Sequence, residues 1–151
     1  MSRLYTVQFN EVAVTAVQDL IQLEAKIVNA IIHKIIISQR TDVGDAQAES
    51  LLIRLKRVTD VVTDAVVEVK LDPGSAAANA NLAVNQITQL VTGAEVIHAE
   101  CWNIALPFVF LPPPELRPVV KINDSFVVDL ATAPADSITM SGVLYFEESG
   151  A

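Results

Sequence analysis

The sequence contains two histidines and one cysteine, the side chains that most often serve as metal ligands, proton carriers or nucleophiles. His98 and Cys101 stand three positions apart in a segment that we expect to be extended, and residues at that spacing point to opposite faces of a strand. His33 lies among isoleucines, where we expect a sheet histidine that is satisfied by hydrogen bonding. The pattern therefore predicts no metal site.

Acidic residues gather around Gly44, where Asp42, Asp45 and Glu49 could offer oxygen ligands to calcium. Their spacing does not match a known calcium-binding loop, so we expect a solvated acidic loop. The same interpretation applies to Asp60, Asp64 and Asp72. The five glycines are too scattered for a phosphate-binding loop, and the sequence has no hydrolase-type arrangement of Ser, His and Asp. We therefore expect no catalytic residue, no cofactor and no enzymatic activity.

The chain is acidic, with 18 Asp and Glu residues against 10 Lys and Arg residues and a formal net charge of −8. Binding to a nucleic-acid backbone or to an anionic membrane needs clustered basic residues. We therefore expect neither nucleic acid nor a membrane as a partner. The single cysteine excludes an internal disulfide and fits a reducing compartment. The first residues lack the continuous apolar core of a signal peptide, which predicts synthesis in the cytoplasm.

The chain is also unusually apolar, with 52% hydrophobic residues and a mean hydropathy of +0.43. No run approaches the ~20 consecutive apolar residues of a membrane helix. Polar residues interrupt the apolar ones at the regular intervals that are typical of sheets. This apolar excess indicates a protein that buries part of its surface against partners, and a well-packed monomer is the alternative.

Residues 26–38, K-I-V-N-A-I-I-H-K-I-I-I-S, are the segment around which we expect the rest of the chain to be arranged. Most of these residues are Ile or Val, which are stiff at χ1 and fit a pleated, buried surface. Apolar side chains occur at both odd and even positions, so both faces of a strand would be apolar. We predict the central strand of a β-sandwich. A buried helix is the alternative, since periodicity alone does not separate the two in a short apolar run.

Alternating polar and apolar residues predict further strands on both sides of this segment. The predicted strands span residues 5–14, 51–58, 65–71, 95–106, 119–122, 126–130 and 138–146, and residues 18–25 fit a short strand or a helical turn. Loops or turns are predicted at 40–49, 72–74 and 132–136. Residues 75–93 should form a long excursion that connects the two sheets, in which 81–91 could be a short helix. The prolines of 111–118 predict an extended polyproline-like crossover, and Asn123-Asp124 predicts a hairpin turn.

These segments together predict an all-β fold, a single antiparallel β-sandwich of jelly-roll type with about eight strands. The chain of 151 residues is long enough to bury roughly two-thirds of its unfolded surface in one core. It has no repeat and no linker-like stretch. We therefore predict one domain over residues 1–151, in which residues 1–4 could form an N-terminal arm.

Aromatic residues and prolines between positions 100 and 118 form the candidate partner-binding site. Rigid side chains lose little entropy when they are fixed at an interface, and Trp and Arg are common anchors there. The alternative is that Trp102 belongs to the core and that the prolines only turn a corner of the chain. The predicted interface residues are Trp102, Phe108, Phe110, Pro112, Pro113, Pro114, Glu115 and Arg117.

Four parts of the sequence together resemble a group of small head proteins of tailed bacteriophages. They are the opening Y-T-V-Q-F-N-E-V-A-V-T with Q-D-L-I-Q-L, the loop S-Q-R-T-D-V-G-D-A-Q-A-E with L-L-I-R-L-K-R, the crossover L-P-P-P-E-L-R-P, and the segment A-P-A-D-S-I-T-M-S-G-V-L-Y-F-E-E. The resemblance runs in order over nearly the whole chain. Residues 26–37 are richer in isoleucine than is usual in that group, and residues 59–93 match it poorly.

The resemblance implies a jelly-roll protein without enzymatic activity that cements or decorates the capsid. In that role, homo-oligomers (dimers or trimers) sit on the outer capsid surface of the virion and bridge neighbouring copies of the major capsid protein. Residues 1–5 and the crossover 108–117 would take part in these contacts. The alternatives are a carbohydrate- or receptor-binding sandwich, such as a fibre tip or lectin-like module, and a head–tail or tail component.

Overall fold

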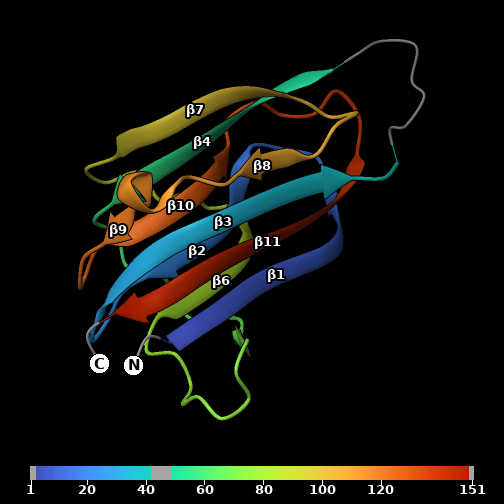
Figure 1. Cartoon of the computed structure of the whole chain (residues 1–151). Helices are drawn as coiled ribbons and strands as arrows, with labels where there is room; N and C mark the ends of the chain where they lie inside the picture. The colour runs from blue at the N-terminus through green and yellow to red at the C-terminus, as the bar shows by residue number, and fades with distance from the viewer. Residues whose placement is uncertain (1–2, 42–48, 150–151) are drawn as a thin grey trace.

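The computed structural model describes residues 3–41 and 49–149, which form two antiparallel sheets packed face to face (Figure 1). Within these residues there are eleven strands and one short 3-10 helix, η1. The elements are β1 (Arg3–Val14), β2 (Gln18–Glu24), β3 (Asn29–Gln39), β4 (Ser50–Val58), β5 (Val69–Lys70), β6 (Asn81–Gln86), β7 (Glu95–Asn103), β8 (Phe108–Phe110), η1 (Pro114–Leu116), β9 (Val119–Val120), β10 (Ser125–Leu130) and β11 (Ile138–Ser149). The prediction of an all-β sandwich is confirmed.

The strand order is that of a jelly roll. One sheet, called here the β11 sheet, has the order β5-β1-β11-β3-β8, with β9 also paired to β3; the other, the β10 sheet, has the order β6-β2-β10-β4-β7. When β8 and β9 are taken as two pieces of one strand and β5 and β6 are left aside, eight strands remain in the orders 1-11-3-8 and 2-10-4-7. Those orders are two interlocked Greek keys. The two extra edge strands come from residues 59–94, the segment between β4 and β7.

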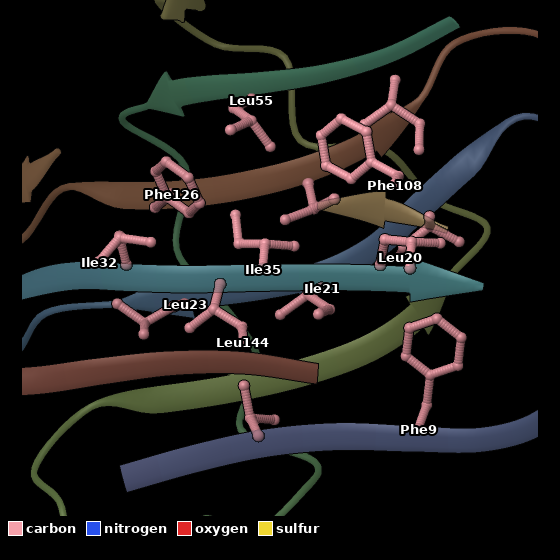
Figure 2. Packing of buried hydrophobic residues seen from close by; sticks show 14 of the residues in the cluster. Phe9, Leu20, Ile21, Leu23, Ile32, Ile35, Leu55, Phe108, Phe126 and Leu144 are labelled. Atoms are coloured by element: carbon pink, nitrogen blue, oxygen red, sulfur yellow. The ribbon is translucent and has the colours of Figure 1, made fainter. Parts of the chain in front are cut away.

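The core lies between the two sheets and follows from the alternation of side chains along each strand. Along β11, every second residue from Ile138 to Glu148 is buried, and Phe146 packs against Tyr5 of β1 with ring centroids 5.3 Å apart. Figure 2 shows aliphatic and aromatic side chains from both sheets filling this space, among them Ile35 from β3 and Phe126 from β10. The core therefore brings together strands that are far apart in the sequence.

The two-sided apolar pattern of residues 26–38 has a different cause from the predicted one. The pairing of β3 with β11 shifts between Phe146, opposite Ile32, and Tyr145, opposite Lys34, so that His33 is an extra residue in a β-bulge. The bulge moves the inward-facing set from even to odd positions: Ala30, Ile32, Ile35 and Ile37 are buried, whereas the outer face is only half-buried. The prediction of a strand here is right, but its position is wrong, because β11 occupies the centre of the sheet and β3 is flanked on its other side only by the short β8 and β9.

Several local predictions are wrong in ways that share one explanation: neighbouring strands decide the local structure. Residues 81–86 form β6 and not a helix, because they pair with the free side of β2. Only Val69 and Lys70 of the strand predicted at 65–71 are in a sheet, since the main-chain N–H groups of Ala65 and Val66 donate to the carbonyl of Leu82 instead. Residues 18–25, for which a strand and a helical turn both fit, contain the buried strand β2.

The predictions for the turn at Asn123-Asp124, the proline-rich crossover and the N-terminal arm also need correction. Asn123-Asp124 does not close a hairpin, because β9 belongs to the β11 sheet and β10 to the other sheet; Asn123 instead turns the chain between sheets with φ +68°. The proline-rich crossover contains η1 and is not extended throughout. Residues 1–4 could have formed an arm, but Arg3 and Leu4 belong to β1 and pair with Glu148 and Glu147 of β11. Of the acidic loop predicted at 40–49, residues 42–48 lie outside the described residues, whereas Glu49 accepts from Ala135 N at 2.6 Å.

Residues 59–94 add a partial third layer on the outer face of the β10 sheet. They leave β4 and return to β7, but in between β5 pairs in the β11 sheet and β6 in the β10 sheet. The prediction that residues 75–93 connect the two sheets is therefore right for its first part, residues 75–80, which lead from β5 to β6. Main-chain N–H groups of this segment donate to carboxylates of the sheet, such as Val62 N to Glu24 Oε2 at 3.0 Å and Leu90 N to Asp19 Oδ2 at 2.8 Å. As a result, β2 is buried along its whole length. The outer face of the β11 sheet is only half-buried by comparison.

Candidate partner-binding surface

Two of the predicted interface residues belong to the core. Trp102 at the end of β7 is 3% exposed and Phe108 in β8 is 2% exposed. The Trp102 Nε1 group donates to the carbonyl of Leu106, which fixes the turn between β7 and β8. Pro112 is buried as well, but it lines the groove that lies beside this segment.

The other predicted residues lie on the surface, where they meet apolar residues that sequence reasoning did not select. Pro113, Pro114 and Glu115 are exposed, and Phe110 is partly buried. Arg117 follows η1 and is partly buried, and its Nε has no hydrogen-bond partner among the described residues. The exposed apolar side chains beside them are Val109 at 50%, Leu111 at 63% and Leu116 at 70% exposure. Side chains alternate along β8, so Phe108 faces inward and Val109 faces outward. The sequence alone already indicates that these two neighbours face opposite sides of a strand.

An open groove of about 380 Å³ separates this segment from β7. We call it the edge groove, because β7 is the edge strand of one sheet and β8 the edge strand of the other (Figure 1). The rings of His98 and Phe110 lie 5.2 Å apart at its base. The side chains that line it include Ile97, His98, Val109, Phe110, Leu111 and Leu116. The arrangement offers shape and apolar area, which suits binding and not bond chemistry.

One carboxylate, that of Glu100, is among the residues that line the edge groove. It lies 3.1 Å from His98 Nε2, and its side chain is 52% exposed. The groove is therefore mostly apolar, with the polar pair of His98 and Glu100 on its β7 side.

The histidines and the cysteine lie apart from one another except along β7. His33 Nε2 lies 2.8 Å from Glu147 Oε2 across the strand pair, as expected for a sheet histidine that is hydrogen-bonded. Cys101 is exposed. Within residues 3–41 and 49–149, no three His, Cys, Asp or Glu side chains come together as a metal-binding group.

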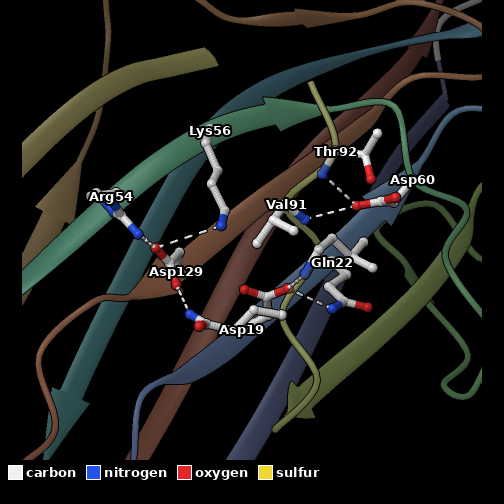
Figure 3. Close-up of polar contacts among 10 residues, drawn as sticks. Asp19, Gln22, Arg54, Lys56, Asp60, Val91, Thr92 and Asp129 are labelled. Atoms are coloured by element: carbon white, nitrogen blue, oxygen red, sulfur yellow. Dashed lines mark hydrogen bonds and ion pairs between the residues drawn. The ribbon is translucent and has the colours of Figure 1, made fainter. Parts of the chain in front are cut away.

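A buried polar cluster that the sequence did not reveal lies beneath residues 87–92 on the β10 sheet (Figure 3). Asp129 accepts from Arg54 Nε at 2.8 Å and lies 3.7 Å from Lys56 Nζ. Gln89 also donates to Asp129 from the covering segment. Burial raises the pKa of Asp19, and the charge of the neighbouring Asp129 raises that pKa further. The carboxylates of Asp19 and Asp129 are fully buried and attach the covering segment, so we regard this cluster as structural.

Asp60 attaches the same segment from its exposed side. Its Oδ2 accepts the main-chain N–H groups of Val91 at 2.7 Å and Thr92 at 2.8 Å. Hydrogen bonds from Thr92 and Val91 hold the pKa of Asp60 below its ordinary value. Asp60, which the sequence suggested to be merely solvated, therefore has a defined structural partner.

The fold and the edge groove define a jelly-roll protein with an exposed, partly apolar groove at one side of the sandwich. Comparisons of this chain with protein-family models, with curated proteins and with solved structures find no match. The one helical element of the described residues is not long and apolar enough to cross a membrane.

Proposed function

We propose that this protein is a structural protein of a bacteriophage virion that cements or decorates the outer surface of the capsid. Its partner is the major capsid protein, and each oligomer bridges neighbouring copies of it. The segment-by-segment resemblance to small phage head proteins supports this role. The jelly-roll topology is the fold that this resemblance implies.

The observation that carries the proposal is the edge groove with its exposed apolar side chains. Soluble monomers rarely leave adjacent apolar groups uncovered unless the surface binds something. Val109, Leu111 and Leu116 are each at least half exposed, and they stand next to one another on β8 and the turn that follows. Transfer of such side chains out of water stabilises a complex by about 25 cal/mol per Å² of apolar surface.

The charge of the chain suits the outside of a particle that is filled with nucleic acid. A net charge of −8 is repelled by a phosphate backbone and offers no basic surface for it. A protein that binds only the assembled capsid stabilises it by mass action. Since a capsid repeats the same contact many times, a gain of a few kcal/mol per copy is sufficient.

The test uses capsids that lack this protein. Adding the purified chain at saturating concentration should raise the temperature at which the capsids release their DNA. The substitution Leu116→Glu places a charge in the edge groove and should weaken binding about tenfold or more, as is usual for an interface anchor. The control Val67→Glu changes a side chain that is 84% exposed outside the groove and should bind as the unchanged protein does. An unchanged release temperature at full occupancy would refute the proposal.

A further inference from the structure

Of the sheet edges within the described residues, β7 is the one that is both long and uncovered. Free N–H and C=O groups at an edge pair readily with another strand, and natural proteins shorten, bend or cover such edges. In the β11 sheet the edge strands β5, β8 and β9 have only two or three residues. In the β10 sheet β6 is covered, since Ala65 N and Val66 N donate to Leu82 O. β7 has nine residues and is the outermost strand at the top of Figure 1.

The main-chain groups that β7 directs to its open side belong to alternate residues. Ile104 N donates to Glu49 O at 3.2 Å, and residues 98–103 continue the same register along β4. In an antiparallel ladder every second residue bonds the neighbouring strand, and the residues between direct their N–H and C=O groups away from it. Even-numbered residues of this part of β7 therefore bond β4, whereas Ala99 and Cys101 direct their main-chain groups to the open side.

The side chains on either side of Ale99_PLACEHOLDER

We propose that two copies of this chain pair through β7 in this register, and that the pair forms the complete capsid-binding groove. The pairing is isologous, with the two Ala99 residues exchanging main-chain hydrogen bonds on the two-fold axis. Side chains opposite each other in a sheet face the same way, so the two edge grooves merge into one. Its walls are Val109, Leu111 and Leu116 of each copy. This inference rests on the proposed function only in that the merged groove binds capsid protein.

Other registers leave the carboxylates of β7 without a donor. A two-fold axis at Glu100 places two carboxylates directly opposite each other, which is destabilising. An axis at Cys101 places Glu100 opposite the buried Trp102. The axis at Ala99 gives each carboxylate a donor from the other copy. The net charge of −8 opposes association only weakly, because charges more than about 8 Å apart are screened at physiological ionic strength.

Sedimentation equilibrium of the full chain over a range of concentrations tests the pairing. We expect a reversible dimer with twice the chain mass of 16.3 kDa. His98→Glu and Glu100→Lys should each weaken the dimer at least tenfold, because each places like charges or two donors opposite each other. Both substitutions in one chain should restore the dimer, and an equimolar mixture of the two single variants should form a heterodimer. The controls Val67→Glu and Asp136→Lys change exposed residues outside β7 and should dimerise as the unchanged chain does.

Two results would overturn the inference at this step. One is a chain that stays monomeric at every concentration. The other is a double variant that dimerises as weakly as the single variants, because the pairing of position 98 with position 100 would then be wrong.

Cross-linking and hydrogen exchange locate the axis. Ala99→Cys in a Cys101→Ser background places two thiols on the axis, so a short bifunctional thiol reagent should join the copies. The exposed Cys101 of the unchanged chain lies four residues from its counterpart along the pair and should not be joined. The Ala99 amide should exchange at least tenfold more slowly in the dimer, whereas the Glu100 amide, which already bonds β4, should not change. Joining through Cys101 alone would overturn the inference.

Capsid binding separates this inference from the proposed function. The His98→Glu variant should bind capsids at least tenfold more weakly, and the double variant should bind as the unchanged chain does. Full capsid binding by a variant that stays monomeric would overturn the inference and leave the proposed function intact. A dimer in this register that does not bind capsids would refute the proposed function and leave the pairing through β7 intact.

Discussion

Asp19 illustrates at the scale of one residue how a buried charge attaches the covering segment. Its Oδ2 accepts from Gln22 Nε2 at 2.7 Å and from Leu90 N at 2.8 Å, whereas its Oδ1 is buried and has no hydrogen-bond partner among the described residues. Because the folded-state pKa is raised, the native protein holds the Asp19 proton more tightly than the unfolded chain does. The ionised carboxylate therefore lowers stability at neutral pH.

The substitution Asp19→Asn should raise the free energy of unfolding at pH 7, because the amide oxygen can still accept the two hydrogen bonds while the buried negative charge is removed. The gain should shrink as the pH falls through the raised pKa toward the ordinary value of about 3.8, because the wild-type carboxyl group is then protonated as well. Urea unfolding at a series of pH values measures both effects. The neighbouring change Asp129→Asn is the contrast: it leaves buried Lys56 without its ion pair and should be destabilising. A destabilising Asp19→Asn would show that the charge itself is needed.

Gly142 lies at the most crowded point of β11. A Cβ atom there would come within 2.5 Å of Phe9 Cε1 and 2.7 Å of Ile37 Cδ1, closer than real contacts allow. We expect Gly142→Ala to lower the free energy of unfolding by about 1–3 kcal/mol, as overpacking of a core does. Gly74→Ala, whose new Cβ would meet only the Asp72 side chain at 3.3 Å, is the control. Thermal unfolding of both variants gives the comparison, and equal melting temperatures would contradict the argument.

At the scale of whole strands, alternation and turn residues were enough to predict the sandwich but not its details. The apolar residues of β3 were visible in the sequence, whereas the bulge at His33, which puts Ile32 and Ile35 on the same core-facing side, depends on the pairing with β11. In the same way, β6 is a strand because β2 has a free side, which no local pattern reports. Alternation within one strand does not predict these features, because each of them depends on the pairing of two strands.

In the candidate site, too, some features could be predicted from the sequence and others depend on how the strands pair. Of the residues predicted in segment 108–117, Phe108 and Pro112 are buried and the others are at least partly exposed. Alternation along β8 indicates that Phe108 and Val109 face opposite ways, but which of the two faces the core depends on the pairing of β8 with β3 at the edge of the sheet. The exposure of Leu116, in η1 beyond this edge strand, is likewise not a local property of the sequence. β7 lies opposite these side chains because the edges of the two sheets adjoin there.

Deletion of His33 tests the role of the bulge. Without it, Ile32 and Ile35 would stand two positions apart in β3, and both would still face the core in a regular ladder. We therefore expect this variant to fold and to melt cooperatively. Deletion of Ile36, a regular position, makes Ile35 and Ile37 neighbours, so one of them must face outward at a cost of roughly 3 kcal/mol. Thermal unfolding followed by circular dichroism compares the two, and equal losses of stability would refute this account.

For the whole molecule, the feature with the widest effect is that strands far apart in sequence lie side by side. β11 is paired with β1 on one side and with β3 on the other, so residues 138–149 hold the sheet together. A chain truncated after residue 137 should show no cooperative thermal transition. A synthetic peptide of residues 138–149 should restore the transition by filling the vacant position between β1 and β3. A truncated chain that melts cooperatively by itself would contradict this prediction.

The central position of β11 has a consequence during translation. While the ribosome is still adding residues, β1 and β3 are already outside, but the strand that separates them has not been made. The nascent chain must therefore keep its apolar strands apart, or bound to a chaperone, until the segment through Ser149 has emerged. A prematurely terminated product would lack the strand that joins β1 to β3, so it would leave the apolar faces of both strands uncovered.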